Sequence, residues 1–236
     1  GGGGTDIPSY YSKYGGFLVS AAINKYVYVL INPRFENSIR VSYSRTENVE
    51  HFEEIQHPII RECLRYVGVV GGVEIVSIAD LPASTGLGSS SSFTVGLLRA
   101  LHAFKNETIR PEQLAEEAYK IEVEVLKEPI GKQDQYISSF GGIVSMDIKT
   151  NGSVDLRPLP LEPEAIKRME QQLLLFYTGL QRSASEVLTE QNHSMAQNVE
   201  PVLESMHKIK DIGYQVRDAL LTSNISQFGA LLNQHW

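Results

Sequence analysis

Glycine and serine are concentrated in one short stretch, residues 80–92, which is expected to bind an anion. An alternating apolar run at 73–78 precedes it, and apolar residues spaced three or four apart follow from Phe93 to Phe104. The stretch therefore connects a strand to the start of a helix. Unpaired backbone N–H groups and the helix dipole make such a turn an anion site, and serine hydroxyls can bond phosphate oxygens or Mg²⁺. It predicts a nucleotide phosphate site, although serines are also ordinary helix N-caps.

Carboxylates form a second candidate group, between residues 121 and 135. Glu122 lies near the end of a predicted helix that begins at Pro111, and Asp134 follows twelve residues later, past a Pro/Gly turn. A phosphotransferase needs carboxylates of this kind, to hold a divalent cation and to accept a hydroxyl proton. Glu124 is a rival to Glu122, because helical spacing favours Glu122 only weakly. The ordinary alternatives are a solvated helix acid for Glu122 and a helix N-cap for Asp134.

Apolar periodicity predicts the elements that must position these groups. Strands are expected at 17–21, 26–31, 38–44, 73–78, 143–148, 154–156 and 173–177, and helices at 55–67, at 93–104, from 108 onward and through most of the chain after 179. Asn151-Gly152 indicates a hairpin. The helix from Pro111 should bury the stripe Leu114, Ala118, Ile121 and Val125. Three prolines then mark a connector, and a domain boundary is expected near residue 165.

Composition narrows the class of protein. The 236 residues are 42% hydrophobic and 21% charged, as in a soluble globular chain. A net charge of -7 gives no electrostatic basis for binding nucleic acid or an anionic membrane. The single cysteine, Cys63, excludes an intrachain disulfide, so we expect a cytoplasmic protein with a buried thiol. No apolar run is long enough to span a bilayer, and no signal peptide is visible.

The glycine- and serine-rich stretch resembles motif 2 of the GHMP kinases, Pro-x-x-x-Gly-Leu-Gly-Ser-Ser followed by small residues. It is not a Walker A loop, because no lysine follows the second glycine. The resemblance implies an α+β, two-domain kinase, with a ribosomal-protein-S5-domain-2-like N-terminal domain at 1–165 and an incomplete ferredoxin-like C-terminal domain at 166–236. ATP would lie over the loop and the sugar between the domains. The implied ATP-binding residues are Pro82, Gly86, Leu87, Gly88, Ser89, Ser90 and Ser91.

Residues 129–135 extend this resemblance, because they read Pro-x-Gly-x-x-Asp-Gln. Galactokinase-type members of the family show a similar string, together with a magnesium-binding Glu and a catalytic Asp at the same spacing. The match implies that Ser90 and Glu122 bind Mg²⁺ and that Asp134 accepts the proton of the acceptor hydroxyl. Lys132 is then expected to lower the pKa of Asp134 and to pair with a phosphate.

The N-terminal segment 2–8 resembles motif 1 of the same superfamily, in which an Asp binds sugar hydroxyls. Most of the chain is similar to one branch, the D-glycero-D-manno-heptose 7-phosphate kinases, which implies phosphorylation of the anomeric hydroxyl for a bacterial lipopolysaccharide or capsule. A phosphorylated acceptor needs a second cationic clamp, for which Arg182 is the first candidate. The residues assigned to the acceptor are Thr5, Asp6, Lys25, Lys132, Thr178 and Arg182.

Two other functions stay open: a kinase of another sugar such as fucose, and a non-catalytic sensor of sugar or nucleotide on the same fold. Ser90, Glu122 and Asp134 together argue against the sensor, which has no need of a base. A homodimer is also open. The strand that opens the family's fold and its third glycine-rich motif have no counterpart in this sequence, so we expect weak or no activity from these 236 residues and activity from a longer parent chain.

Overall fold

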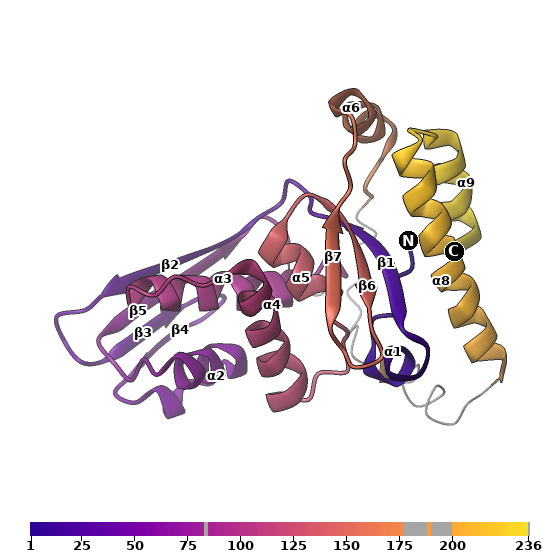
Figure 1. Ribbon diagram of the computed structural model, residues 1–236. Helices are drawn as coiled ribbons and strands as arrows, with labels where there is room; N and C mark the ends of the chain where they lie inside the picture. The colour runs from indigo at the N-terminus through magenta and orange to yellow at the C-terminus, as the bar shows by residue number, and fades with distance from the viewer. Residues whose placement is uncertain (83–84, 177–187, 190–199, 236) are drawn as a thin grey trace. The chain divides into compact units, whose positions relative to one another are not determined.

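The computed structural model describes residues 1–82, 85–176, 188–189 and 200–235 (Figure 1). The chain forms two compact units, each assembled from segments that are distant in sequence. Unit 1 comprises residues 1–22, 129–133 and 141–236, and unit 2 comprises residues 23–128 and 134–140. Residue 165 falls inside unit 1, so it does not separate these two units. The domain boundary expected there remains a prediction.

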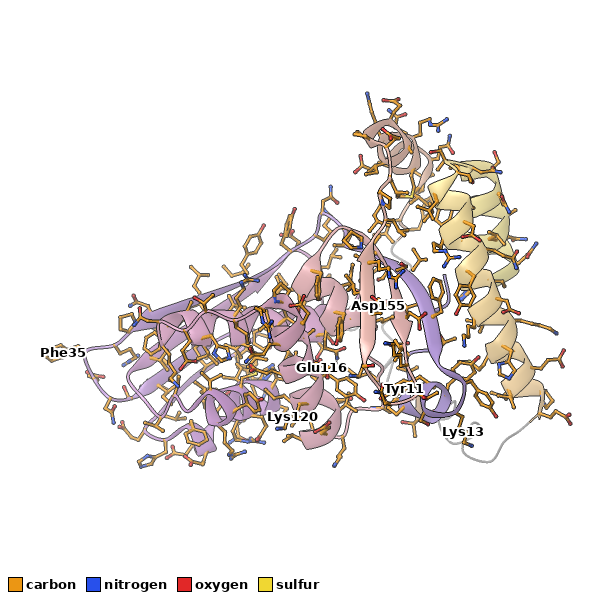
Figure 2. All side chains as sticks on the ribbon, viewed as in Figure 1. Tyr11, Lys13, Phe35, Glu116, Lys120 and Asp155 are labelled. Atoms are coloured by element: carbon orange, nitrogen blue, oxygen red, sulfur yellow. The ribbon has the colours of Figure 1, made fainter. Side chains whose placement is uncertain are left out.

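Unit 2 is built on a four-stranded sheet of order β2-β5-β3-β4, in which β3 and β5 run parallel and the other neighbours run antiparallel. Its strands are β2 (Val27–Pro33), β3 (Ile39–Ser42), β4 (Thr46–Val49) and β5 (Val73–Ala79). Its helical segments are η1 (Phe52–Glu54), α2 (Pro58–Val67), α3 (Ser89–Phe104), α4 (Pro111–Tyr119), η2 (Lys120–Val125) and α5 (Gln133–Phe140). Phe35, in the turn after β2, is fully exposed and points away from the sheet (Figure 2).

The core of unit 2 follows the predicted periodicity. Alternate residues of β3 and β5 are buried, because a strand presents every second side chain to one face. Helix α3 buries Leu97, Leu98 and Leu101 in the same core, at the predicted helical spacing. Cys63 of α2 is buried there as well, and burial raises the pKa of its thiol well above the ordinary value, as expected for an unreactive cysteine.

The end of the α4 helix departs from the prediction. After α4 the helix widens into a π-helical turn at η2. There, Leu126 N–H donates to the carbonyl oxygen of Ile121, five residues earlier, over 2.9 Å. Leu114, Ala118 and Ile121 are buried as predicted, whereas Val125 is 46% exposed. The expectation for Val125 was wrong because the wider turn rotates every following side chain relative to an α-helical wheel.

Unit 1 contains a three-stranded antiparallel sheet of order β1-β6-β7. Its elements are α1 (Pro8–Tyr14), β1 (Gly16–Ala21), β6 (Ile143–Ile148), β7 (Val154–Pro158), α6 (Pro163–Gln172), α8 (Glu200–Leu221) and α9 (Ile225–His235). The predicted hairpin joins β6 to β7, and Gly152 takes the left-handed φ of +83° that its turn requires. Val216 and Leu220 of α8 are buried in a core with Leu231 of α9.

The strand predicted at 173–177 is not formed over residues 173–176, the part that the structure describes. This segment follows α6 in an irregular conformation, and its apolar side chains Leu173, Leu174, Leu175 and Phe176 are exposed. The prediction was wrong for these residues because a strand needs a neighbour to pair with, and none of the described strands pairs with this segment.

Candidate functional site

The glycine- and serine-rich loop ends at the N-terminus of α3, as predicted. Gly88 is the residue before the helix and has φ +68°, a conformation that favours glycine. The first helical bond runs from Ser92 N–H to the Gly88 carbonyl oxygen over 2.9 Å. The N–H groups of Ser89, Ser90 and Ser91 precede that bond, so they have no carbonyl partner within the helix and can serve an anion.

The other predicted loop residues lie in the segment that leads into α3. Gly86 also has a left-handed φ, of +75°. Pro82, Gly86 and Leu87 are exposed, which leaves this part of the loop accessible to a ligand. Ser91 is buried, and its hydroxyl accepts a hydrogen bond from the side-chain amide of Gln135 over 3.2 Å. Ser91 would therefore offer a phosphate its backbone N–H rather than its side chain.

Glu122 is the acid that the fold brings to this loop. It lies in η2 with only 1% of its surface exposed, and its Oε1 accepts hydrogen bonds from the hydroxyls of Ser90 (3.1 Å) and Thr94 (3.0 Å). Its Oε2 accepts a hydrogen bond from the Gln135 side chain over 2.7 Å. Burial raises the pKa of Glu122 above its ordinary value, and these hydrogen bonds oppose the rise.

Glu124, the rival acid, is exposed on the outer side of η2. It lies two residues from Glu122, and in the turn of a helix this separation points the two side chains in different directions. The structure therefore joins Glu122, and not Glu124, to the hydroxyl of Ser90.

Asp134 reaches the same helix terminus from α5. The Asp134 Cγ atom lies 3.0 Å from the position that a Cβ on Gly88 would occupy, so the carboxylate rests against the backbone at the start of α3. Among the contacts that hold α5 there, the Ser92 and Ser138 hydroxyls are 2.9 Å apart, and Tyr136 donates a hydrogen bond to Glu116 of α4 (Glu116 is labelled in Figure 2). The start of α3 thus has Glu122 and Asp134 beside it, and the roles that the resemblance implies for them remain predictions.

Thr94 and Gln135 are site residues that the sequence predictions missed. Thr94 is buried one helical turn after Ser90, and its hydroxyl also donates to the Ser90 carbonyl oxygen over 3.0 Å. The i, i+4 spacing from Ser90 was the available signal. Gln135 is buried next to Asp134, but nothing local indicated that its amide reaches back to Glu122.

The predicted acceptor residues at the N-terminus are buried in unit 1. The Thr5 hydroxyl donates to the carbonyl oxygens of Gly2 and Phe17 and accepts a hydrogen bond from Phe17 N–H. The Asp6 carboxylate is 3% exposed and accepts backbone N–H groups of Gly4 (3.1 Å) and Gln133 (2.9 Å). These contacts tie the segment into the fold, and contact with a sugar remains a prediction for both residues.

The predicted cations differ in their surroundings. Lys25 is exposed in unit 2, where its charge is available to a ligand in solution. Lys132 is only 4% exposed, and belongs to unit 1. Thr178 and Arg182 lie outside the described residues. A role of any of these four at the acceptor stays a prediction.

Comparison with known proteins decides the family. Residues 54–142, which contain the loop, Glu122 and Asp134, match the family model described as the GHMP kinases N terminal domain. The chain carries a GHMP kinase N-terminal domain. The fold agrees: a crystal structure of a D-glycero-D-manno-heptose 1-phosphate kinase from Bacteroides thetaiotaomicron superposes with a TM-score of 0.84 and 25% identity, covering 100% of this chain and 74% of that one.

Curated proteins similar to this chain include sugar kinases. A D-glycero-alpha-D-manno-heptose 7-phosphate kinase from Campylobacter jejuni is 28% identical over 250 residues, covering 100% of this chain and 72% of the relative. A galactokinase from Pyrococcus furiosus is 29% identical over 195 residues, covering 71% of this chain and 53% of the relative. The α+β fold expected from the sequence is confirmed by these structural neighbours.

The candidate site at the start of α3 offers donors that suit Mg²⁺. Mg²⁺ prefers oxygen ligands and is usually held by one or two carboxylates together with substrate phosphates. Ser90 and Glu122 supply a hydroxyl and a carboxylate oxygen 3.1 Å apart, beside the predicted phosphate loop. Among the described residues, no three His, Cys, Asp or Glu side chains are grouped as a protein-only metal site. The donor set therefore fits a metal that arrives with its nucleotide.

None of the helices in the described parts of the chain has the length and apolar content needed to cross a membrane.

Proposed function

We propose that this protein is an ATP- and Mg²⁺-dependent sugar kinase that phosphorylates the anomeric hydroxyl of D-glycero-D-manno-heptose 7-phosphate. The observation that carries the proposal is the arrangement at the start of α3, where Glu122 hydrogen-bonds Ser90 and the Asp134 carboxylate rests against Gly88. The heptose acceptor is supported by the names of the Campylobacter and Bacteroides relatives, a 7-phosphate kinase and a 1-phosphate kinase respectively.

The chain's own groups account for the transfer in this proposal. The N–H groups of Ser89, Ser90 and Ser91 bind the β- and γ-phosphates of ATP. Asp134 accepts the proton of the acceptor hydroxyl while the hydroxyl oxygen forms a bond to the γ-phosphorus of ATP. The bond from that phosphorus to the β,γ-bridging oxygen breaks. ADP leaves with the electron pair of the broken bond, and the sugar becomes its 1,7-bisphosphate.

Ser90 and Glu122 would hold Mg²⁺ in this scheme. When bound, Mg²⁺ neutralises the charge on the β- and γ-phosphate oxygens. Thr94 and Gln135 hydrogen-bond the Glu122 carboxylate and so fix its direction. A carboxylate that is fixed in advance loses less rotamer freedom when it binds a metal.

The acceptor's 7-phosphate would need its own cation, and we propose Arg182, Lys25 and Lys132 as candidates. The residues that we propose near the sugar are Thr178, Thr5 and Asp6. The bisphosphate product would supply nucleotide-activated heptose for a bacterial surface glycan. We place the enzyme in the cytoplasm, where ATP is available and Cys63 stays reduced.

Release of ADP against an acceptor panel tests the function. The full-length protein is supplied with ATP, Mg²⁺ and one acceptor at a time: the heptose 7-phosphate, the unphosphorylated heptose, the heptose 1-phosphate, galactose, fucose or mevalonate. We expect ADP release with the heptose 7-phosphate above all others, and a 1,7-bisphosphate product by phosphorus NMR.

Other outcomes of this panel identify the alternatives. Release of ADP with fucose or galactose and not with the heptose phosphates would make the protein a kinase of another sugar, and fucokinases are among its relatives. Calorimetric binding of sugar or nucleotide without ADP release would make it a sensor. Either result contradicts the heptose proposal.

A further inference from the structure

Gln135 is a buried amide that faces Glu122 from the interior of unit 2. The residue is 0% exposed, and its Nε2 donates hydrogen bonds to Glu122 Oε2 over 2.7 Å and to the Ser91 hydroxyl over 3.2 Å. Both protons of the amide nitrogen are thereby used. The amide oxygen Oε1 is also buried, and it has no hydrogen-bond partner among the described residues. The amide is therefore held through its nitrogen.

The charge of Glu122 sets the orientation of this amide. Turning the amide over would bring its oxygen against Oε2 of the carboxylate, so that two acceptors would face each other. Glu122 is buried, and water would not screen that contact. A hydrogen bond to an ionised acceptor is stronger than one between neutral groups, which offsets the cost of leaving the oxygen of Gln135 without a partner. The amide N–H therefore stays on Glu122 Oε2.

The two oxygens of Glu122 have donors of different kinds. Oε1 accepts from the hydroxyls of Ser90 and Thr94, whereas Oε2 accepts from the amide of Gln135. A hydroxyl can rotate to another acceptor. Thr94 has one in reach, the Ser90 carbonyl oxygen at 3.0 Å, and Ser90 is exposed, so that solvent can accept its proton. Oε1 can thus be freed for a metal ion, while Oε2 stays bound to Gln135.

This difference between the oxygens bears on the choice of metal. Mg²⁺ is small and demands octahedral geometry, whereas Ca²⁺ is larger, takes more oxygen ligands and can bind both oxygens of one carboxylate. We propose that Gln135 is a specificity-determining residue for the metal: it holds Oε2, leaves Glu122 only Oε1 to offer, and so favours Mg²⁺ over Ca²⁺. The inference rests on the proposed function, because it takes Glu122 as a ligand of the metal that accompanies ATP.

Calorimetry with the full-length protein tests this preference. A non-hydrolysable ATP analogue is titrated in saturating Mg²⁺ and again in saturating Ca²⁺, and the ratio of the two Kd values measures the preference for Mg²⁺. Gln135→Met keeps the length of the side chain and removes both N–H donors. The preference for Mg²⁺ should fall about ten- to a hundredfold in Gln135→Met, the usual loss when a partner of a metal ligand is removed. A ratio that the substitution leaves unchanged would overturn the proposal.

Gln113→Met is the matched control. Gln113 of α4 makes the same kind of bond within unit 2, from its Nε2 to Glu117 Oε1 over 2.9 Å, and Glu117 is not assigned to the metal. The control should leave the ratio of Kd values unchanged. An equal fall in Gln113→Met would show that the ratio responds to the loss of any amide–carboxylate bond, which also contradicts the proposal.

NMR of the wild type tests the contact without a substitution. The side-chain N–H protons of Gln135 should keep their slow exchange with water when the Mg²⁺ complex of the analogue binds, because Oε2 still accepts from this amide. Exchange as fast as that of an exposed amide would refute the proposal, even where Gln135→Met does not fold. If the wild type binds the analogue with neither metal, the proposed function fails and this inference fails with it. Binding by the wild type with an unchanged ratio in Gln135→Met refutes the inference alone.

Discussion

The hydroxyl of Ser90 donates a hydrogen bond to Glu122 Oε1 over 3.1 Å, which joins the first turn of α3 to the π-helical segment η2. The wider turn of η2 buries Glu122 toward α3 and leaves Glu124 in solvent. π-Helical turns inside helices frequently occur at functional sites. Of the two nearby acids in this turn, only Glu122 hydrogen-bonds Ser90 of the predicted phosphate loop.

Glu122→Gln should lower Mg²⁺-dependent turnover. The substituted amide has no negative charge for the metal, and its NH2 is a further donor facing three groups that already donate, those of Ser90, Thr94 and Gln135. The loss should be at least about ten- to a hundredfold, since even partners behind a metal ligand cost that much. Steady-state rates over a Mg²⁺ titration measure it. Glu124→Gln is the matched control with unchanged rates, and a larger loss for Glu124→Gln would transfer the metal role to that residue.

Asp134→Asn should abolish most turnover and leave ATP binding intact. An amide does not accept the proton of the acceptor hydroxyl, and general-base catalysis typically contributes about 10²–10⁴-fold. ADP release measures turnover, and calorimetry with a non-hydrolysable ATP analogue measures binding. Asp155→Asn removes a half-buried acid of β7, paired with Arg157, and should have no effect (Figure 2). Near-normal turnover of Asp134→Asn would remove Asp134 from the catalytic role.

Sequence patterns predicted the elements around this site because strand alternation and helical spacing depend only on residues that are close together in sequence. Alternation over 73–78 and helical spacing over 93–104 gave β5, the loop and α3 in the right order. The pairing of strands was beyond such patterns. β1 and β2 are neighbours in sequence but belong to different sheets, because β1 pairs with β6, from Gly16↔Ile148 to Ala21↔Ile143. These partners are separated by more than half of the chain.

The site itself was predicted as far as residue types and motif spacing reach. The hydroxyl of Ser90 and the carboxylates of Glu122 and Asp134 meet at one helix terminus, but spacing left Glu122 and Glu124 open. Burial decides between them, because Glu122 is buried and Glu124 is exposed, and motif spacing does not show burial. The bond from Gln133 to Asp6 was also out of reach, since a motif assigns a residue type and not its hydrogen-bond partner.

Gly88→Ala should impair turnover more than its cost in stability explains. Gly88 and Gly68 both have left-handed φ angles, +68° and +77°, so an alanine at either costs about 1–2 kcal/mol of folding free energy. Of these two glycines, only Gly88 would place its added Cβ against the proposed base, 3.0 Å from Asp134 Cγ. At Gly68 it meets nothing within 4 Å. Urea unfolding should show similar losses for the two variants, and ADP release should fall only for Gly88→Ala. Equal turnover in both would mean that Asp134 does not need its position against Gly88.

Unit 1 should lose stability at alkaline pH as Tyr10 loses its proton. Its ring is fully buried, and its hydroxyl hydrogen-bonds His207 Nδ1 over 2.8 Å. Burial and the nearby charge of Asp211 raise the pKa of Tyr10 to about 12. In the unfolded chain a tyrosine has a pKa of about 10, so the folded state holds this proton more tightly. The stability that results is fully present below pH 10 and is lost as the pH rises from about 10 to about 12.

Urea unfolding of the wild type and of Tyr10→Phe at several pH values between 8 and 11 measures this effect. Two pKa units correspond to at most about 2–3 kcal/mol, of which part is lost by pH 11. The phenylalanine has no proton to lose, so the wild type should lose more stability than Tyr10→Phe over this range, and the gap between them should narrow. Tyr28→Phe, at an exposed position of β2, controls for loss of any tyrosine and should follow the wild type. Parallel pH curves for the wild type and Tyr10→Phe would show that Tyr10 keeps an ordinary affinity for its proton in the folded state.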